Sequence, residues 1–246
     1  MSPNGKLKLS LILNLLLIAA LAGIFTRQYR KKQEEQKRAA EEAAKPHLYT
    51  DNPQYAEQTD FYTLFGTQAN IVMLGNSHYY RIHWNELLGR GDVANRGIGS
   101  DITEGYLNRM QSVLSASPKI CFIEGGGNDI FWKVPVDTIL QHIGQITRIL
   151  KDHKIKPVLT ALFFAGHDFP HNDSSKYNNQ VALLNEGLHR MAIADTLPII
   201  DINKQLIDKD RYLKREYVRG DGIHLTSAAY AIWRDSVNAV LNREGF

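Results

Sequence analysis

Residues 71–77 read IVMLGNS, four apolar residues followed by a Gly-Asn-Ser turn. A short, continuous apolar run that ends in a turn is typical of a strand buried on both faces. Four further runs of this kind follow along the chain, at residues 93–95, 120–124, 157–163 and 197–202. The stretch 71–77 therefore predicts the first strand of a buried sheet, with a polar turn at its carboxyl end.

Helical patterns separate these runs. They lie at about residues 79–89, 102–116, 134–153 and 175–193, and a last helix is expected at about 227–242. Strands that alternate with helices indicate a parallel sheet covered by helices on both faces. The sequence shows no internal repeat and no domain boundary after Pro46. Residues 46–246 are therefore expected to form one α/β domain.

Polar residues collect directly after the predicted strands and before the last helix. The segments are 75–77 (GNS), 95–99 (NRGIG), 125–129 (GGGND) and 221–226 (DGIHLT). In an open parallel sheet, ligands bind outside the carboxyl ends of the strands. We therefore expect a hydroxyl, glycine turns, a side-chain amide and an acid–histidine pair to meet at one edge of the sheet.

These residue types match the needs of nucleophilic catalysis. A serine hydroxyl is a weak nucleophile until a base within hydrogen-bond reach takes its proton, and a carboxylate orients that base. Negative charge that develops on a substrate oxygen needs fixed hydrogen-bond donors. Ser77, His224 and Asp221 fit the first three roles, and Gly97 and Asn128 fit the role of donors.

The four blocks, in this order, resemble the SGNH hydrolases, also called the GDSL esterase/lipase superfamily. The second block, with its Gly-Ile-Gly, resembles the platelet-activating-factor acetylhydrolase-like branch. The match spans about residues 68–242 and leaves out the first 45. The resemblance implies a flavodoxin-like three-layer α/β/α sandwich with five parallel strands in the order 2-1-3-4-5. It also implies ester hydrolysis without a metal or an organic cofactor.

Carried over residue by residue, the resemblance implies Ser77 as nucleophile, His224 as base and Asp221 as the residue that orients it. The oxyanion hole would consist of the backbone N–H groups of Ser77 and Gly97 and the Asn128 side chain. The α/β-hydrolases are a weaker alternative, because their G-x-S-x-G elbow needs a second glycine where this sequence has Tyr79.

One residue departs from the family pattern. Asn76 stands where the family usually has an aspartate, so a charge beside the nucleophile is missing. An asparagine oxygen can still accept a hydrogen bond from the following turn. The substitution therefore leaves catalysis possible, while the rate and the pH profile stay open.

Several other side chains invite a functional interpretation. We expect His78 to face the surface or the substrate, and Cys121, the single cysteine, to lie in the core. One cysteine excludes a disulfide framework and a cysteine-based zinc site. His167 and His171 have an i,i+4 spacing, but Pro170 between them favours a loop over a helical metal site. The sequence leaves open whether three aromatic residues line a substrate pocket or pack between helices: Tyr79, Tyr80 and Trp84.

The N-terminal segment differs from the rest. Residues 1–8 form a short, basic N-terminus. Residues 9–25 read LSLILNLLLIAALAGIF and contain no charged residue. As a helix this run is about 26 Å long, the short limit for crossing a bilayer. Residues 26–45 are rich in helix formers and predict a charged helical spacer. We expect an uncleaved single-pass membrane anchor, with a signal peptide cleaved near residues 20–22 as the alternative.

The net charge also differs between the N-terminal segment and the rest of the chain. The chain has 29 Lys and Arg against 26 Asp and Glu, but residues 1–45 alone hold nine of the basic and four of the acidic residues. Residues 46–246 are therefore slightly acidic, and a nucleic-acid surface is not indicated. The domain is expected in the periplasm or another extracytoplasmic space, and secreted if the segment is cleaved.

The sequence thus predicts a membrane-anchored serine esterase. It would hydrolyse a short acyl ester, most plausibly acetyl on a carbohydrate, through an acyl-enzyme. The substrate is a small-molecule or polysaccharide ester. Alternatives with the same triad are a lysophospholipase, a thioesterase or an O-acyltransferase, and an alternative of another class is a non-catalytic, membrane-tethered binding module. The oligomeric state is not predicted.

Overall fold

The computed structural model describes residues 21–38, 47–169 and 174–246. Residues 21–38 are helical and exposed, and Leu48–Phe246 form a separate compact unit. Within the described residues, no helix combines the length and the apolar character that a membrane span requires. Most of the predicted anchor, residues 9–20, lies outside them, as do residues 39–45 of the predicted spacer. The rest of the spacer, residues 26–38, is helical as predicted.

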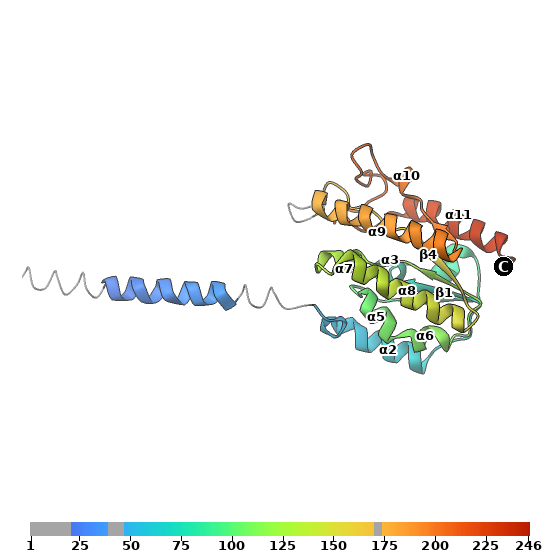
Figure 1. Ribbon diagram of the computed structural model, residues 1–246, viewed down its shortest axis with the longest axis horizontal. Coiled ribbons are helices and arrows are strands. Elements are labelled where there is room, and N and C mark those ends of the chain that lie inside the picture. Colours follow the sequence, from blue (N-terminus) through green and yellow to red (C-terminus); the bar gives the residue numbers. More distant parts are fainter. Residues whose placement is uncertain (1–20, 39–46, 170–173) are drawn as a thin grey trace, which may run out of the picture. The chain divides into compact units, whose positions relative to one another are not determined.

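A parallel sheet of five strands forms the centre of the compact unit, in the order β2-β1-β3-β4-β5 (Figure 1). The strands are β1 (Ile71–Gly75), β2 (Val93–Gly97), β3 (Ile120–Ile123), β4 (Lys156–Thr160) and β5 (Ile199–Ile200). In the register of β1 and β2, Gly75 stands beside Gly97, so both strands end at the same level. The predicted sheet, with its order and its parallel strands, is confirmed.

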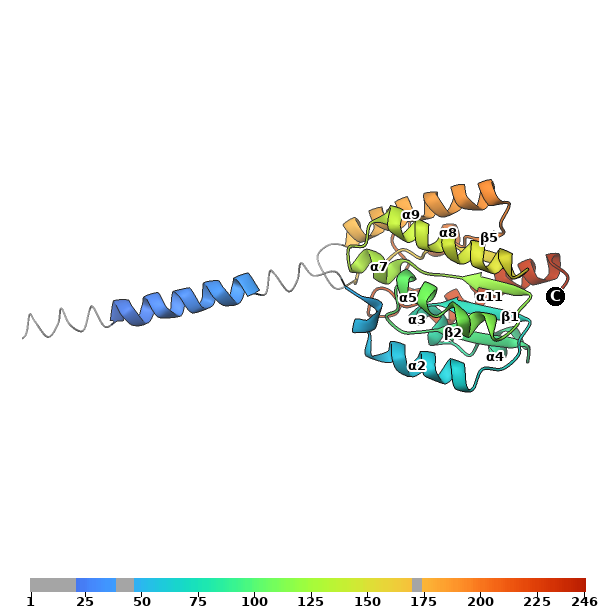
Figure 2. The same cartoon turned by 60° about the horizontal axis from the view of Figure 1, so that its bottom comes forward.

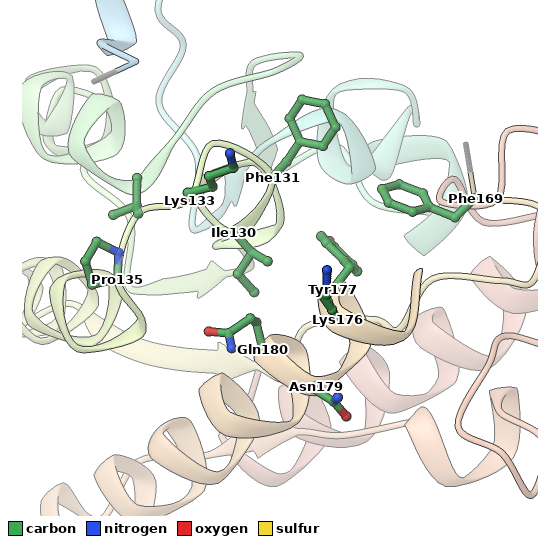
Figure 3. A pocket seen from close by; sticks show the side chains of 10 residues that line it. Ile130, Phe131, Lys133, Pro135, Phe169, Lys176, Tyr177, Asn179 and Gln180 are labelled. Atoms are coloured by element: carbon green, nitrogen blue, oxygen red, sulfur yellow. The ribbon is translucent and has the colours of Figure 1, made fainter. Parts of the chain in front are cut away.

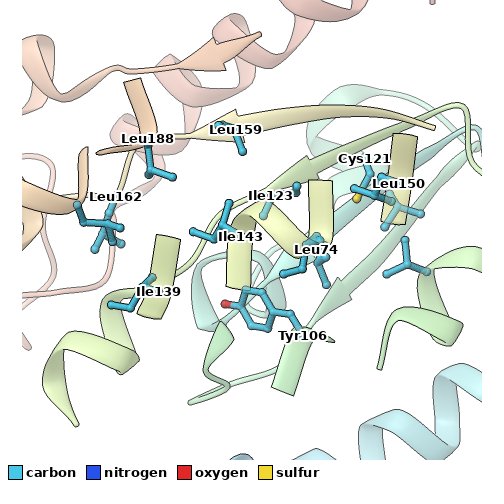
Figure 4. Close-up of a cluster of buried hydrophobic side chains, with 14 of the residues drawn as sticks. Leu74, Tyr106, Cys121, Ile123, Ile139, Ile143, Leu150, Leu159, Leu162 and Leu188 are labelled. Carbon is cyan, nitrogen blue, oxygen red and sulfur yellow. The ribbon is translucent and has the colours of Figure 1, made fainter. Parts of the chain in front are cut away.

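Four helices cover one face of this sheet: α5 (Thr103–Asn108), α6 (Met110–Leu114), α8 (Val136–Asp152) and α9 (Ser174–Asp195). Successive side chains of a strand point to opposite faces, so Leu74 of β1 and Ile123 of β3 face this layer. Figure 4 shows them packed against Tyr106 of α5 and Ile143 of α8. Cys121 is fully buried in the same cluster, as predicted.

The opposite face is covered by α3 (Ser77–Tyr80), α4 (Trp84–Leu88), α10 (Asn203–Leu206) and α11 (Ser227–Arg243). Its core is aromatic. The ring of Tyr79 stacks on Trp233 with centroids 5.0 Å apart, and Trp84 meets Trp233 edge-on at 5.0 Å. Tyr79 and Trp84 are fully buried, so both pack between elements and neither lines a substrate pocket.

Two predicted helices are each broken into a pair. The stretch 79–89 holds α3 and α4, and the stretch 102–116 holds α5 and α6, which meet at Arg109. Arg109 has φ −113° and ψ 19°, outside the helical region. Its fully buried guanidinium makes hydrogen bonds to three different segments. These contacts hold Arg109 in its non-helical conformation, so that one helix does not continue through it.

The last two strands are shorter than predicted. Beyond β4, the backbone of Leu162 exchanges two hydrogen bonds with the side-chain amide of Asn185, at 2.7 and 2.9 Å. Ala165 pairs with the amide of Asn178 in the same way. Helix α9 thus supplies partners that a neighbouring strand would otherwise provide. After β5, the Asp201 carboxylate accepts the N–H of Asn203 at 3.0 Å, which turns the chain into α10.

A short helix η1 (Tyr49–Asp51) and helix α2 (Pro53–Leu64) precede the sheet and were not predicted. The Asn52 side chain accepts the N–H of Gln54 and so caps α2. The same side chain donates to the carbonyl of Gly99 at 2.7 Å, and the Tyr62 hydroxyl donates to the carbonyl of Gly97 at 2.6 Å. Helix α2, on the β2 side of the sheet in Figure 2, therefore braces the loop that follows β2.

Candidate active site

The predicted nucleophile stands at the start of a helix. β1 ends at Gly75, and α3 begins at Ser77. Between them, the buried Asn76 side chain accepts the backbone N–H of His78 at 2.9 Å and caps α3. The expectation that asparagine can cap this turn is confirmed. A Cβ at Gly75 would collide with the ring of Tyr79, so the tight entry into this helix requires glycine.

The hydroxyl, the imidazole and the carboxylate meet as predicted. Ser77 Oγ lies 2.9 Å from His224 Nε2, and His224 Nδ1 lies 2.7 Å from Asp221 Oδ2. The other carboxylate oxygen of Asp221 accepts the backbone N–H groups of Ile223 and His224, at 3.1 and 2.9 Å. With Nδ1–H donated to Asp221, Nε2 has a free lone pair toward Ser77. This is the arrangement that lets an imidazole take a proton from serine.

The charge states also suit a base at neutral pH. Partial burial acts to raise the pKa of Asp221, but the hydrogen bonds from the His224 backbone, the His224 ring and the Ile223 backbone outweigh it and lower the pKa to about 2. Burial lowers the pKa of His224 below its usual 6.5, although Asp221 acts in the opposite direction. Asp221 is therefore ionised and His224 neutral at pH 7.

Asn128 is placed to hold a developing oxyanion. It lies in the first turn of α7 (Gly127–Phe131) and lines the same cavity as Ser77 and His224. One N–H of its amide donates to the carbonyl of Asp101 at 2.8 Å. Because a primary amide has two donors, the second N–H is available to a substrate.

Gly97 does not take the role that was predicted for it. Its backbone N–H donates to the side chain of Asn95 at 2.8 Å, and the residue is absent from the lining of the catalytic cavity. A Cβ at this position would collide with the backbone of Tyr80. The glycine is therefore required by the close approach of α3 to β2, and the geometry contradicts its place in the oxyanion hole.

Ser100, three residues later, occupies the place expected of Gly97. It lines the cavity and has φ +59°, a left-handed conformation that favours glycine. Its backbone N–H makes no hydrogen bond within the described residues. Three residues at the cavity therefore offer hydrogen-bond donors: Ser77 and Ser100 through their backbone N–H groups, and Asn128 through its side-chain amide. The sequence alone did not point to Ser100, because a serine gives no sign that its backbone N–H faces the cavity.

A buried arginine fixes the loop that carries Ser100. The Arg109 guanidinium donates to Asp101 at 2.8 Å, to the carbonyl of Arg96 at 2.7 Å and to the carbonyl of Gly75 at 3.0 Å. Arg109 and Asp101 are both fully buried. One side chain thus joins the ends of β1 and β2 to the loop. Donors held in this way need no rearrangement when charge develops.

Two cavities lie at this edge of the sheet. The catalytic cavity has a volume of about 340 Å³, and Tyr80 and Arg81 lie on its wall. A second cavity of about 570 Å³ adjoins it (Figure 3). Three residues line both cavities: Phe131, Phe169 and Tyr177. Their combined space lies in the range of small-molecule binding sites.

His167, one of the two histidines with the i,i+4 spacing, contacts a carboxylate and an aromatic ring. His167 Nε2 pairs with Asp208 at 3.0 Å and its ring stacks on Tyr212 at 4.0 Å, while His171 lies outside the described residues. Among the residues that the structure describes, no group of three or more His, Cys, Asp or Glu could hold a metal ion. His78 is buried, so the expectation that it faces the surface was wrong, but it is among the residues that line the catalytic cavity, which agrees with the substrate-facing alternative.

Comparisons with known proteins agree with this geometry. Residues 73–232 match the model of the GDSL-like lipase/acylhydrolase family. The fold is similar to a GDSL-like lipase from Bacteroides thetaiotaomicron, with TM-score 0.69 and 21% identity over 77% of this chain and 99% of that chain. A search of curated proteins finds no match.

Two further structures share the fold. One is a protein from Streptococcus pneumonia that is provisionally named a platelet activating factor, with TM-score 0.65 and 23% identity over 76% of this chain and 90% of that chain. The other is the acetyl xylan esterase AlAXEase, with TM-score 0.58 and 17% identity over 70% of this chain and 98% of that chain.

Proposed function

Because this chain belongs to the GDSL-like lipase/acylhydrolase family, and is therefore an ester hydrolase, we propose that it cleaves a short-chain ester, an acetyl group on a carbohydrate, through an acyl-enzyme on Ser77. The observation that carries the proposal is the continuous set of contacts from Ser77 through His224 to Asp221, beside a cavity with free donors.

In the first half of the reaction, Ser77 Oγ attacks the ester carbonyl while its proton moves to His224 Nε2. The carbonyl oxygen becomes an oxyanion, which accepts hydrogen bonds from the N–H groups of Ser77 and Ser100 and from Asn128. The carbon–oxygen bond to the alcohol then breaks, and His224 returns the proton to the leaving oxygen. Asp221 stabilises the imidazolium that exists between these two transfers.

In the second half, a water molecule takes the place of the alcohol. His224 removes a proton from the water as its oxygen attacks the acyl carbon, and the same donors hold the second oxyanion. The bond between the acyl carbon and Ser77 Oγ breaks, and the proton returns to Ser77. The products are the free acid and the regenerated serine.

The size of the adjoining cavity supports an ester substrate with a bulky alcohol group. An acetyl group fills only a small part of about 570 Å³, so this space suits the remainder of the substrate. Its aromatic wall (Phe131, Phe169, Tyr177) offers flat faces for a sugar ring, and Asn179 and Gln180 offer amides for hydroxyl groups. The fold similarity to an acetyl xylan esterase agrees with this proposal.

A lipid-like acyl chain is the second candidate. Ile130, Val134 and Pro135 form an apolar side of the same cavity, and a medium-length acyl chain of a lysophospholipid or a thioester would fit against them. An O-acyltransferase would use the same triad and differ only in its acceptor. A non-catalytic binding module would have no need of the complete contacts among Ser77, His224 and Asp221.

We also propose that residues 9–25 anchor the protein in a membrane and place the domain outside the cytoplasm. The support is the uncharged run and the basic residues before it. Protease added to intact cells, and then to spheroplasts, tests this placement. Cleavage of the domain only after the outer layer is opened is expected, and protection in spheroplasts would contradict it.

The substrate is tested with the full-length protein and p-nitrophenyl esters from acetate to octanoate, together with an acetylated oligosaccharide. We expect kcat/KM to fall as the chain lengthens and acetate to be released from the oligosaccharide. Ser77→Ala should abolish both activities. Ser236→Ala is the matched control, because that hydroxyl bonds only Ile232 of its own helix. A rate that rises with chain length would favour the lipid-like substrate.

A further inference from the structure

His78 follows the nucleophile directly and is among the residues that line the catalytic cavity. The residue is buried, and the edge of its ring meets Phe163 at a centroid distance of 5.3 Å. Its Nε2 lies 3.2 Å from the carbonyl oxygen of Ile223, and its Nδ1 lies 3.5 Å from Oε1 of Glu124. The two nitrogens thus contact two different segments of the site.

Glu124 is buried, and His78 is its ion-pair partner within the described part of the chain. It ends the buried run of β3, and both carboxylate oxygens are inaccessible and make no hydrogen bond among the described residues. A buried carboxylate is costly unless a cation or hydrogen bonds compensate it. The nearby Arg109 is already engaged by Asp101 and two carbonyl groups. His78 is therefore the group that can supply the positive charge.

The carbonyl of Ile223 adds a second argument. A carbonyl oxygen accepts only, so Nε2 of His78 must carry a proton. If Nδ1, which faces the Glu124 carboxylate, also carries one, the ring is an imidazolium between an anion and a carbonyl. Burial lowers the pKa of His78, but the negative charge of the contacting Glu124 and the hydrogen bond to the Ile223 carbonyl raise it above its usual value.

Other titratable groups surround His78 and Glu124. Arg81 at the end of α3 and His224 before α11 lie on one side, and the Tyr230 hydroxyl of α11 donates to the His78 carbonyl at 2.7 Å. The charge of Glu124 also acts on four phenols: Tyr79, Tyr106, Tyr177 and Tyr230. Phenols are neutral at pH 7, so none of these four competes with Glu124 for the proton.

Ile223 lies between Asp221 and His224 in the chain. The bond from His78 to Ile223 therefore ties the loop of the base to the helix of the nucleophile. The two imidazole rings are close, with centroids 5.6 Å apart. A positive charge on His78 opposes protonation of His224 and so keeps the base in its active, neutral form.

We propose that His78 is a positioning residue for the reaction: protonated on both ring nitrogens and paired with Glu124, it holds the 221–224 loop and keeps a positive charge beside His224. The proposal rests on the proposed function for its kinetic consequences. The protonation of the His78 ring and its contact with Glu124 do not depend on the proposed function.

Kinetics of matched variants separate the two parts of the role. In His78→Gln, the amide can still donate to the Ile223 carbonyl, but the charge is lost. We expect the acid limb of the kcat/KM profile to move to higher pH by about one unit, with the plateau kcat within about threefold. Glu124→Gln should move the limb in the same direction, and the double variant should add little. In His78→Leu, which also loses the donor, the plateau kcat should fall by about tenfold or more.

His189→Gln is the control, because His189 pairs with Asp201 at 2.9 Å on the surface, away from the site. Its profile should match the wild type. An unchanged acid limb in His78→Gln and Glu124→Gln would overturn the proposal. A fall of the plateau in every His78 variant without a shift of the limb would reduce the role to packing and would also overturn it.

A measurement on the wild-type protein does not depend on any variant or on activity. Nitrogen-15 NMR of the His78 ring, assigned through its contact with Phe163, reports whether one or both nitrogens carry a proton. We expect two protonated nitrogens at pH 7. One bare nitrogen would overturn the proposal even if the enzyme is active. Two protonated nitrogens without hydrolysis would refute the proposed function and leave the His78–Glu124 pair intact.

Discussion

Ser77 and His224 are 147 positions apart in the chain, yet Ser77 Oγ lies 2.9 Å from His224 Nε2. The parallel sheet brings them together, because Ser77 follows β1, which lies between β2 and β3, and His224 precedes α11, which packs on the same face as α3. The distance is that of a serine and its base in direct contact.

The pH profile should report His224. As the pH falls through its lowered pKa, His224 takes up a proton and the base is lost, so the acid limb of kcat/KM should lie below pH 6.5. Asp221, with its pKa at about 2, stays ionised throughout this range. Initial rates from pH 4 to 8 check this. Asp221→Asn should lower the rate at every pH by about 10³–10⁴, and an acid limb above pH 7 in the wild type would contradict the assignment.

Asn128→Ala should lower kcat by about 10²–10³ with little change in KM, because a donor to the oxyanion acts mainly in the transition state. Steady-state kinetics on p-nitrophenyl acetate measure both constants. Asn108→Ala is the control, because the exposed Asn108 amide donates to the Glu104 carbonyl of its own helix and lines neither cavity. An equal loss in both variants would argue against a specific role for Asn128.

Ser100 should tolerate glycine and reject a β-branched residue. At φ +59°, Ser100→Gly removes a conformational conflict, so stability should be unchanged or raised by up to about 1 kcal/mol, and kcat should stay within about threefold. Ser100→Val should shift the loop and lower kcat by about tenfold or more. Urea unfolding and kinetics measure both effects. Wild-type kcat in the valine variant would show that this backbone N–H is not an oxyanion donor.

The residues at the strand ends could be predicted because all parallel strands end at one edge. Four polar segments therefore gave the triad and Asn128 without any knowledge of side-chain direction. The α9 amides that replace strand partners for Leu162 and Ala165 could not be foreseen. Each requires a pairing between residues on different elements.

The loop after β2 also could not be predicted in detail, for the same reason. Residues 97–100 read GIGS, and the family pattern favours a glycine as donor. The left-handed position instead falls on Ser100, in a loop fixed by Arg109, which bonds β1, β2 and Asp101 at once. The expectation of an exposed His78 failed for a similar reason. A polar residue is normally exposed, but this imidazole is buried and contacts Glu124, which follows β3.

Covalent labelling of the nucleophile tests the central claim most directly. The full-length protein is treated with a fluorophosphonate, which reacts with an activated serine, and the modified peptide is identified by mass spectrometry. We predict a single adduct on Ser77, absent in Ser77→Ala and strongly slowed in His224→Gln, with hydrolysis lost in parallel. A folded wild-type protein that hydrolyses esters without an adduct on Ser77, or that is labelled equally fast in His224→Gln, would contradict the account.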